Sequence, residues 1–254
     1  MPTLLRPTAP VAADALLPGD PARAMALAQV LLDEPRMSNH AHGLWGYHGR
    51  TKTGRALTIQ ATGVGGPSGA MVLADLAELG TRRAVRVGPC LSLADDPAIG
   101  DVLVVERALA ADGTSAALGA GRWAAPDPGL FEALIAAGGE AARPAAVVST
   151  DLLWEPAAGD RRTGPRRVDA WLSEGAVAAE MQAAALLTLG NRLGLAVGCL
   201  LVVSDGVDGP SGEEAEDRLA EASVRAGEIG ALALQVSPGG DVPQESSSEA
   251  VTPS

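Results

Sequence analysis

Two hydrophobic patterns alternate along this chain between residues 13 and 236. Short runs of Val, Leu and Ala, bounded by Gly and Pro, are typical of buried strands. Longer segments rich in Ala and Leu separate these runs and predict helices. The alternation favours a layered α/β fold, and because neither a linker nor an internal repeat interrupts it, we expect a single domain.

The pattern places each expected element by residue number. Strands are predicted at 15–17, 84–87, 101–108, 145–148, 176–179 and 196–203, with a hairpin formed by 44–49 and 56–61. Helices are predicted at 22–32, 67–80, 127–137, 181–193 and 211–234. The last helix begins with Ser211 and Glu214, which have the spacing of a capping box.

The two ends of the chain depart from this pattern. Residues 1–12 are rich in Pro and Ala and are expected to form a flexible lead-in. Residues 237–254 are polar and rich in Ser, Pro and Gly, so we expect a disordered acidic tail there. No signal-peptide pattern and no apolar run of membrane-spanning length occurs, so a cytoplasmic protein is expected.

The composition narrows the class of partner. Hydrophobic residues make up 47% of the 254 residues, and the formal net charge is −12. Such an acidic chain lacks the basic surface of a nucleic-acid binder, so we expect a small-molecule partner, with no nucleic acid and no membrane. The two cysteines and the cluster His40, His42 and His48 lack metal-ligand spacing, so no metal is expected.

Glycine and arginine occur together where strands end. In the turn after 15–17, Gly19 lets the backbone approach an oxyanion, and Arg23 can close over it at a helix N-terminus. An ordinary β-turn with a solvated arginine explains the same residues. Arg86 stands inside an apolar strand, where its charge needs either a protein carboxylate or a bound anion. The Gly-rich turn 63–66 predicts a close approach of backbone to a ligand or to the sheet.

The C-terminal half carries further polar candidates. Glu180, Met181 and Gln182 stand where a strand meets a helix, and an acid and an amide there bind sugar hydroxyls or complement the helix dipole. Asp205 ends the most apolar strand, so it is a candidate general acid or a cap of the following loop. Arg218, on the last helix, has the spacing of a surface ion pair with Glu214.

Taken in order, these motifs resemble those of the nucleoside phosphorylase-I family of purine nucleoside and uridine phosphorylases. The resemblance covers residues 14–235 and is strongest to the hexameric bacterial purine branch. It rests on five motifs, which are Leu17-Pro18-Gly19-Asp20-Pro21-x-Arg23, Gly63-Val64-Gly65-Gly66-Pro67-Ser68, Arg86-Val87-Gly88, Glu180-Met181-Gln182-Ala183-Ala184 and Ser204-Asp205. The family fold implies one α/β domain whose central mixed β-sheet is partly closed into a barrel and flanked by helices.

The resemblance also implies a reaction and a set of roles. The reaction is phosphorolysis of purine (deoxy)ribonucleosides to the free base and (deoxy)ribose 1-phosphate, with inorganic phosphate as co-substrate and no other cofactor. Asp205 would protonate the departing purine, assisted by Arg218. Phosphate would be held by Gly19, Arg23 and Arg86, and by His42 across a dimer interface. The nucleoside would contact Val64, Leu153, Trp154, Glu180, Met181 and Gln182. The active form would be a homo-oligomer of dimers, up to a hexamer.

Four departures from the family pattern fall in the site itself. Pro89 replaces a phosphate-binding Ser or Thr, and Leu91-Ser92 displaces a glycine of the base pocket. Gln182 replaces a ribose-binding Glu, and His42 stands where the family has an arginine. They keep three alternatives open. One is a uridine or modified-nucleoside phosphorylase, one is a hydrolytic nucleosidase, and one is a non-catalytic nucleoside-binding homologue.

Overall fold

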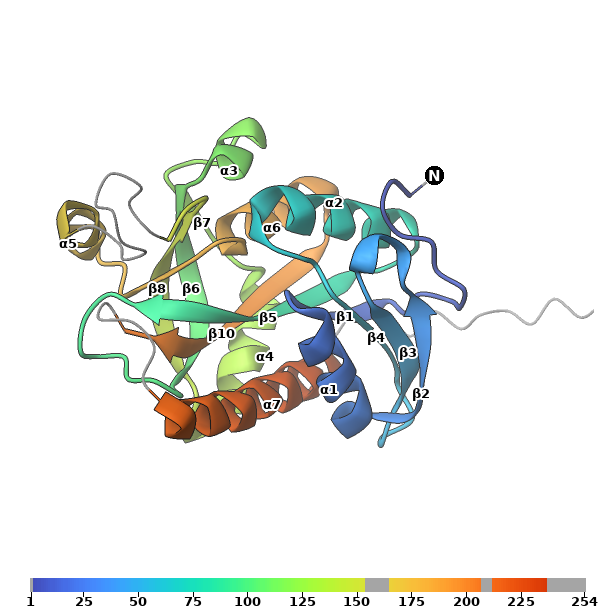
Figure 1. Ribbon diagram of the computed structural model, residues 1–254. Helices are drawn as coiled ribbons and strands as arrows, with labels where there is room; N and C mark the ends of the chain where they lie inside the picture. Colours follow the sequence, from blue (N-terminus) through green and yellow to red (C-terminus); the bar gives the residue numbers. More distant parts are fainter. Residues whose placement is uncertain (1, 154–164, 207–211, 237–254) are drawn as a thin grey trace, which may run out of the picture.

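The computed structural model describes residues 2–153, 165–206 and 212–236. Three predicted features lie outside the described residues. They are Trp154, the capping residue Ser211 and the tail at 237–254. The described residues form a single α/β domain around one mixed sheet, as the sequence predicts (Figure 1).

Ten strands make up the sheet in the described residues. They are β1 (Asp14–Pro18), β2 (Leu32–Asn39), β3 (Gly46–Thr51), β4 (Ala56–Gln60), β5 (Arg83–Ser92), β6 (Val102–Ala111), β7 (Trp123–Ala124), β8 (Arg143–Thr150), β9 (Ala178–Glu180) and β10 (Ala196–Asp205). The predicted hairpin is confirmed as the antiparallel pair β3–β4. The sequence pattern missed β2, because its five central residues are all exposed.

Part of the sheet closes into a barrel. Strand β5 pairs with both β9 and β10, and the ring continues through the pairs β10–β6, β6–β8 and β8–β9. The strands β1, β4, β3 and β2 extend from β5 as an open arm. The partly closed mixed sheet expected from the family resemblance is therefore confirmed.

Seven α-helices flank the sheet in the described part of the chain. They are α1 (Pro21–Leu31), α2 (Gly65–Glu78), α3 (Gly113–Ala117), α4 (Pro128–Gly138), α5 (Pro165–Ser173), α6 (Ala183–Leu193) and α7 (Gly212–Val236), with 3-10 turns η1 (Ala41–Gly43) and η2 (Gly139–Ala141). Helices α1, α4 and α7 pack together on one side of the sheet, and α2 and α6 pack together on the other (Figure 1).

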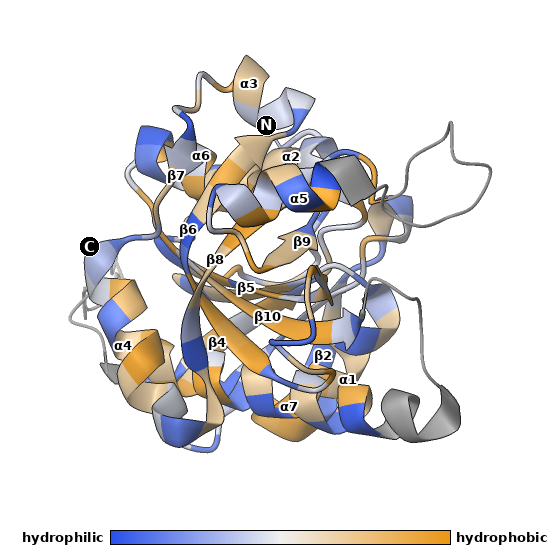
Figure 2. Cartoon of the chain, turned by 90° about the vertical axis from the view of Figure 1, so that its left-hand side faces the viewer, coloured by the Kyte–Doolittle hydropathy of each residue, from blue (hydrophilic) through white to orange (hydrophobic). Residues whose placement is uncertain are grey.

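Strand side chains alternate between these two helical layers. In β1, Ala15 and Leu17 belong to the core beneath α2 and α6, whereas Leu16 belongs to the core beneath α1, α4 and α7. Figure 2 shows β10 apolar along most of its length, as a strand covered on both faces should be. In β5 the same alternation puts Ala84 on the α2–α6 side, so Arg86 projects toward that layer as well.

The N-terminal segment is tied to α2. The buried Asp75 carboxylate accepts hydrogen bonds from the backbone N–H groups of Thr3, Leu4 and Leu5 at 2.7, 2.6 and 2.8 Å. Farther along, the N–H of Thr8 donates to a carbonyl of β2. Of the segment expected as a flexible lead-in, the described residues 2–12 contain no helix or strand but are anchored by hydrogen bonds, which the sequence pattern did not predict.

Candidate active site

Eight predicted site residues line one pocket of about 270 Å³ beyond the carboxyl ends of β1 and β4. They are Gly19, Arg23, Val64, Arg86, Leu153, Glu180, Met181 and Gln182. The pocket is completed by Asp20, Pro21, Gly63, Gly65 and Pro89. Because α/β folds bind ligands at the carboxyl ends of parallel strands, this pocket is the candidate active site.

Three helices begin at the pocket. Their N-cap residues are Asp20 for α1, Val64 for α2 and Gln182 for α6, and all three line it. The first N–H groups of a helix have no partner within the helix, and the helix dipole favours negative charge at that end. The pocket therefore favours an anionic ligand, although the protein as a whole is acidic.

Arg23 stands in the first turn of α1. The Asp20 carboxylate caps this helix by accepting the backbone N–H of Arg23 at 2.9 Å. Burial lowers the pKa of Arg23, the Asp20 carboxylate opposes that shift, and the Arg86 charge adds to it. Two guanidinium groups, one from the first turn of α1 and one from strand β5, thus line one pocket.

Arg86 is buried and paired. Its Nε and Nη2 each lie 3.2 Å from Oε2 of Glu180, and Nη1 donates to Oε1 of Gln182 at 2.5 Å. The guanidinium fits because residue 88 is glycine, since a Cβ there would lie 2.6 Å from Nη2. The sequence left open whether a carboxylate or an anion partners Arg86. The structure gives it a carboxylate, and the buried guanidinium also lines the pocket.

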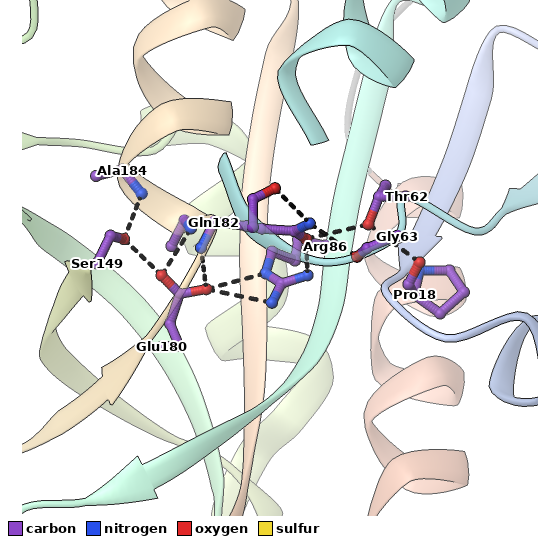
Figure 3. Close-up of polar contacts among 10 residues, drawn as sticks. Pro18, Thr62, Gly63, Arg86, Ser149, Glu180, Gln182 and Ala184 are labelled. Atoms are coloured by element: carbon purple, nitrogen blue, oxygen red, sulfur yellow. Dashed lines mark hydrogen bonds and ion pairs between the residues drawn. The ribbon is translucent and has the colours of Figure 1, made fainter. Parts of the chain in front are cut away.

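Glu180 is fully engaged by the protein (Figure 3). Its Oε1 accepts the Ser149 hydroxyl at 2.5 Å and the N–H of Ala183 at 2.8 Å. Its Oε2 accepts Arg86 and the N–H of Gln182. The carboxylate therefore holds Arg86 on one side and caps the start of α6 on the other. The cap agrees with the helix-dipole interpretation, and the contact of Glu180 with sugar hydroxyls stays a prediction.

Three predicted site residues lie outside the pocket lining. His42 is exposed in η1 and has left-handed backbone, with φ of 56°. Asp205 is half-buried at the end of β10 beside Leu91, and its Oδ2 lies 2.7 Å from the Ser204 hydroxyl. Arg218 is exposed on α7, beside Gly100 of the loop after β5. The roles given to these three residues stay predictions.

The sequence reasoning missed two polar residues at the site. Ser149, at the end of β8, donates to Glu180 and accepts the N–H of Ala184 at 2.8 Å. Thr62, after β4, donates to Gln182 Oε1 at 3.0 Å. Both are buried hydroxyl residues at the ends of buried strands. A polar residue directly after an apolar strand is the signal that would have marked them.

The site offers arginine, carboxylate and amide chemistry. Burial raises the pKa of both Cys90 and Cys199, so neither thiol is activated as a nucleophile. The described residues contain no group of three or more His, Cys, Asp or Glu that could hold a metal ion. No described helix has both the length and the apolar character needed to cross a membrane.

Comparison with known proteins identifies the class to which this fold and pocket belong. The profile of the Phosphorylase superfamily matches residues 14–235, and the chain belongs to that family. It is 30% identical over 216 residues to a DeoD-type purine nucleoside phosphorylase of Clostridium novyi, covering 80% of this chain and 86% of the relative. It is 31% identical over 221 residues to the DeoD-type enzyme of Geobacillus kaustophilus, covering 83% and 88%.

Other relatives differ in name. A guanosine phosphorylase of Halorubrum lacusprofundi is 28% identical over 213 residues, covering 82% of this chain and 85% of the relative. Among solved structures, uridine phosphorylase from Vibrio fischeri superimposes with a TM-score of 0.78 at 22% identity, covering 88% of this chain and 91% of that one. At this identity the structural similarity establishes the fold alone.

Proposed function

We propose that this protein cleaves the N-glycosidic bond of purine (deoxy)ribonucleosides with inorganic phosphate, yielding the free base and (deoxy)ribose 1-phosphate. The observation that carries the proposal is the convergence of Arg23 and Arg86 on one pocket where three helices begin. The names of the relatives at about 30% identity support a nucleoside as the second substrate.

The anion-binding half of the pocket suits phosphate. Among the described residues, the Arg23 side chain forms no ion pair with a carboxylate within 4.0 Å, and Asp20 is engaged by a backbone N–H. Nη1 of Arg86 carries two N–H groups, donates one of them to Gln182, and lies close to Gly19. An arginine fork and the N-terminus of α2, which has no side-chain cap, match the oxygens of a phosphate.

The opposite half suits a nucleoside. Val64, Leu153 and Met181 line the pocket with apolar surface, and Val64 is 80% exposed, so it is available to a flat base or a sugar face. Placing the sugar C1′ between this surface and the bound phosphate would let an anionic oxygen stabilise the oxocarbenium-like sugar as the bond breaks.

Departure of the base needs a proton. We assign that role to Asp205, which lies beside Leu91, two residues along β5 from the pocket-lining Pro89. Positioned proton transfer contributes about 10²–10⁴-fold. A purine accepts such a proton at N7, so the acid favours the purine branch, with Arg218 as its assisting cation. Pro89 and His42, which depart from the family pattern, favour one alternative, a pyrimidine or modified nucleoside.

His42 suggests how the pocket is completed. It is exposed and does not line the pocket of its own chain. We propose that it contributes to the phosphate site of a second copy, so that the active form is at least a dimer. Sedimentation of the active protein as dimers or hexamers is expected, and a fully active monomer would contradict this.

A nucleoside panel tests the proposal. Inosine, guanosine, adenosine, their 2′-deoxy forms and uridine are each incubated with and without phosphate, and free base is measured. Phosphate-dependent release of a purine base is expected. Phosphate-dependent release of uracil alone would establish the pyrimidine alternative. Release that does not depend on phosphate would establish a nucleosidase, and binding without turnover would establish a non-catalytic homologue.

A further inference from the structure

Gln182 is more constrained than a residue poised to bind a substrate hydroxyl. Its side-chain amide offers two N–H donors and two oxygen lone pairs. Nε2 donates to the carbonyl oxygens of Gly63 and Gly65 at 2.9 and 3.0 Å. Oε1 accepts from Arg86 Nη1 at 2.5 Å and from the Thr62 hydroxyl at 3.0 Å (Figure 3). The Thr62 hydroxyl has one proton and also lies 3.3 Å from the Pro18 carbonyl oxygen, so this donor is shared. The protein still supplies a partner at each of the four positions.

The neighbours fix which way this amide points. The carbonyls of Gly63 and Gly65 only accept hydrogen bonds, and the guanidinium of Arg86 only donates. A rotated amide would turn its oxygen toward two carbonyls and its N–H groups toward a cation. The side chain is 1% exposed, and a Cβ at Gly69 of α2 would lie 3.2 Å from its Cδ, so close packing also holds the amide in place.

We propose that Gln182 is a positioning residue that joins Arg86 to the turn 62–65, and that it acts on the anion-binding half of the pocket instead of binding the sugar. The turn carries Gly63, Val64 and Gly65 along the pocket wall and leads into the first turn of α2. One amide thus fixes the positions of the Arg86 guanidinium and of the turn that leads into α2. A bound anion would contact both. The identity of the anion as phosphate rests on the proposed function.

A glutamate, the residue that the family resemblance leads one to expect here, would not serve this arrangement. Its second oxygen would face the carbonyls of Gly63 and Gly65, where an N–H is needed. Its charge would stand beside Arg86, which Glu180 already neutralises. A second carboxylate next to the anion site repels the ligand, and it loosens the turn that forms the pocket wall.

The test is anion binding by Gln182→Glu in the full-length protein, measured by calorimetry with inorganic phosphate and with sulfate. Sulfate is included because its charge is constant between mildly acidic and mildly alkaline pH. We expect the dissociation constant at alkaline pH to rise by at least about tenfold, since like charges brought together in a desolvated site repel strongly. As the pH falls through the pKa of the new carboxyl, protonation removes the charge and restores a donor, so sulfate affinity should partly recover.

Gln60→Glu is the matched control. Gln60 is also buried, and its Nε2 donates to the carbonyls of Leu44 and Ala61, but it does not line the pocket. The same substitution there should leave sulfate affinity and its pH dependence as in the wild type. If Gln182→Glu does not fold, Gln182→Met removes the four hydrogen bonds without adding charge, and it too must weaken sulfate binding.

The outcomes separate this inference from the proposed function. Unchanged anion affinity in Gln182→Glu, with nucleoside affinity increased, would overturn the inference and make residue 182 a sugar ligand. If the wild type binds neither anion, the proposed function fails, and amide hydrogen exchange then decides the inference. The N–H groups of Thr62 and Gly63 donate to the carbonyls of Pro18 and Gly19. Faster exchange of these two N–H groups in the Gln182 variant than in the wild type supports the positioning role, and unchanged exchange overturns it.

Discussion

Arg86 and Glu180 form a buried ion pair in which Nε and Nη2 of the arginine both lie 3.2 Å from one carboxylate oxygen. Their side chains are 5% and 0% exposed. Removing one partner of such a pair leaves the other charge buried without a partner. We therefore expect Glu180→Gln to lower the free energy of unfolding by about 3 kcal/mol, measured by urea denaturation.

The same variant tests whether Arg86 faces an anion site. Phosphate should raise the melting temperature of Glu180→Gln more than that of the wild type, because the ligand then neutralises Arg86. Glu174→Gln is the control, since its ion pair with Arg122 is solvent-exposed and should contribute little to stability. Equal stability of Glu180→Gln and wild type would show that the pair is not buried as described.

Arg23 should contribute to phosphate affinity more than to stability. Its side chain lines the pocket, whereas its backbone N–H makes the contact with Asp20. Arg23→Met is expected to raise the KM for phosphate by about tenfold to a hundredfold, the value of a lost hydrogen bond to a charged group. Arg50→Met, at an exposed position of β3, is the control. A phosphate KM unchanged in Arg23→Met would remove this residue from the anion site.

Asp205 should affect the chemical step. Asp205→Asn is expected to lower kcat for inosine by about 10²–10⁴-fold while the phosphate KM changes little, because the amide cannot donate a proton to N7. Asp101→Asn serves as control, since that carboxylate lies at the surface near Arg143. Turnover of 6-oxopurine nucleosides at the wild-type rate in Asp205→Asn would show that another group is the acid.

Asp75 should hold the N-terminal segment on α2. Asp75→Ala leaves three backbone N–H groups without their acceptor, and one of them, that of Leu5, is buried. We expect a loss of about 1–3 kcal/mol in the free energy of unfolding and faster hydrogen exchange at residues 3–5. Glu221→Ala, at an exposed position of α7, should change neither quantity. Unchanged exchange at residues 3–5 would mean that the carboxylate does not anchor the segment.

The layered fold could be predicted because its signal is periodic. The strand at Ala196–Asp205 is a continuous apolar run and the helix at Pro128–Gly138 has an apolar face, so both stand out locally. The strand Leu32–Asn39 could not be found in this way. Five exposed positions, including Pro35, give it no strand pattern, and only its pairing with β3 makes it a strand.

The site could be predicted only as far as single motifs carry information. Gly19 and Arg23 predict an anion-binding turn, and in the structure both residues line one pocket with Arg86. The saturation of Gln182 depends on Thr62 and on two carbonyls more than a hundred residues away in the chain. No local pattern encodes such a contact, so the residue resembled a sugar ligand in the sequence.

The most direct test of the central claim is phosphorus NMR of the reaction of inosine with inorganic phosphate. The account predicts that a sugar 1-phosphate forms in step with hypoxanthine, that nothing is released without phosphate, and that Arg23→Met slows both products together. Release of hypoxanthine and free ribose at the same rate whether or not phosphate is present would contradict it.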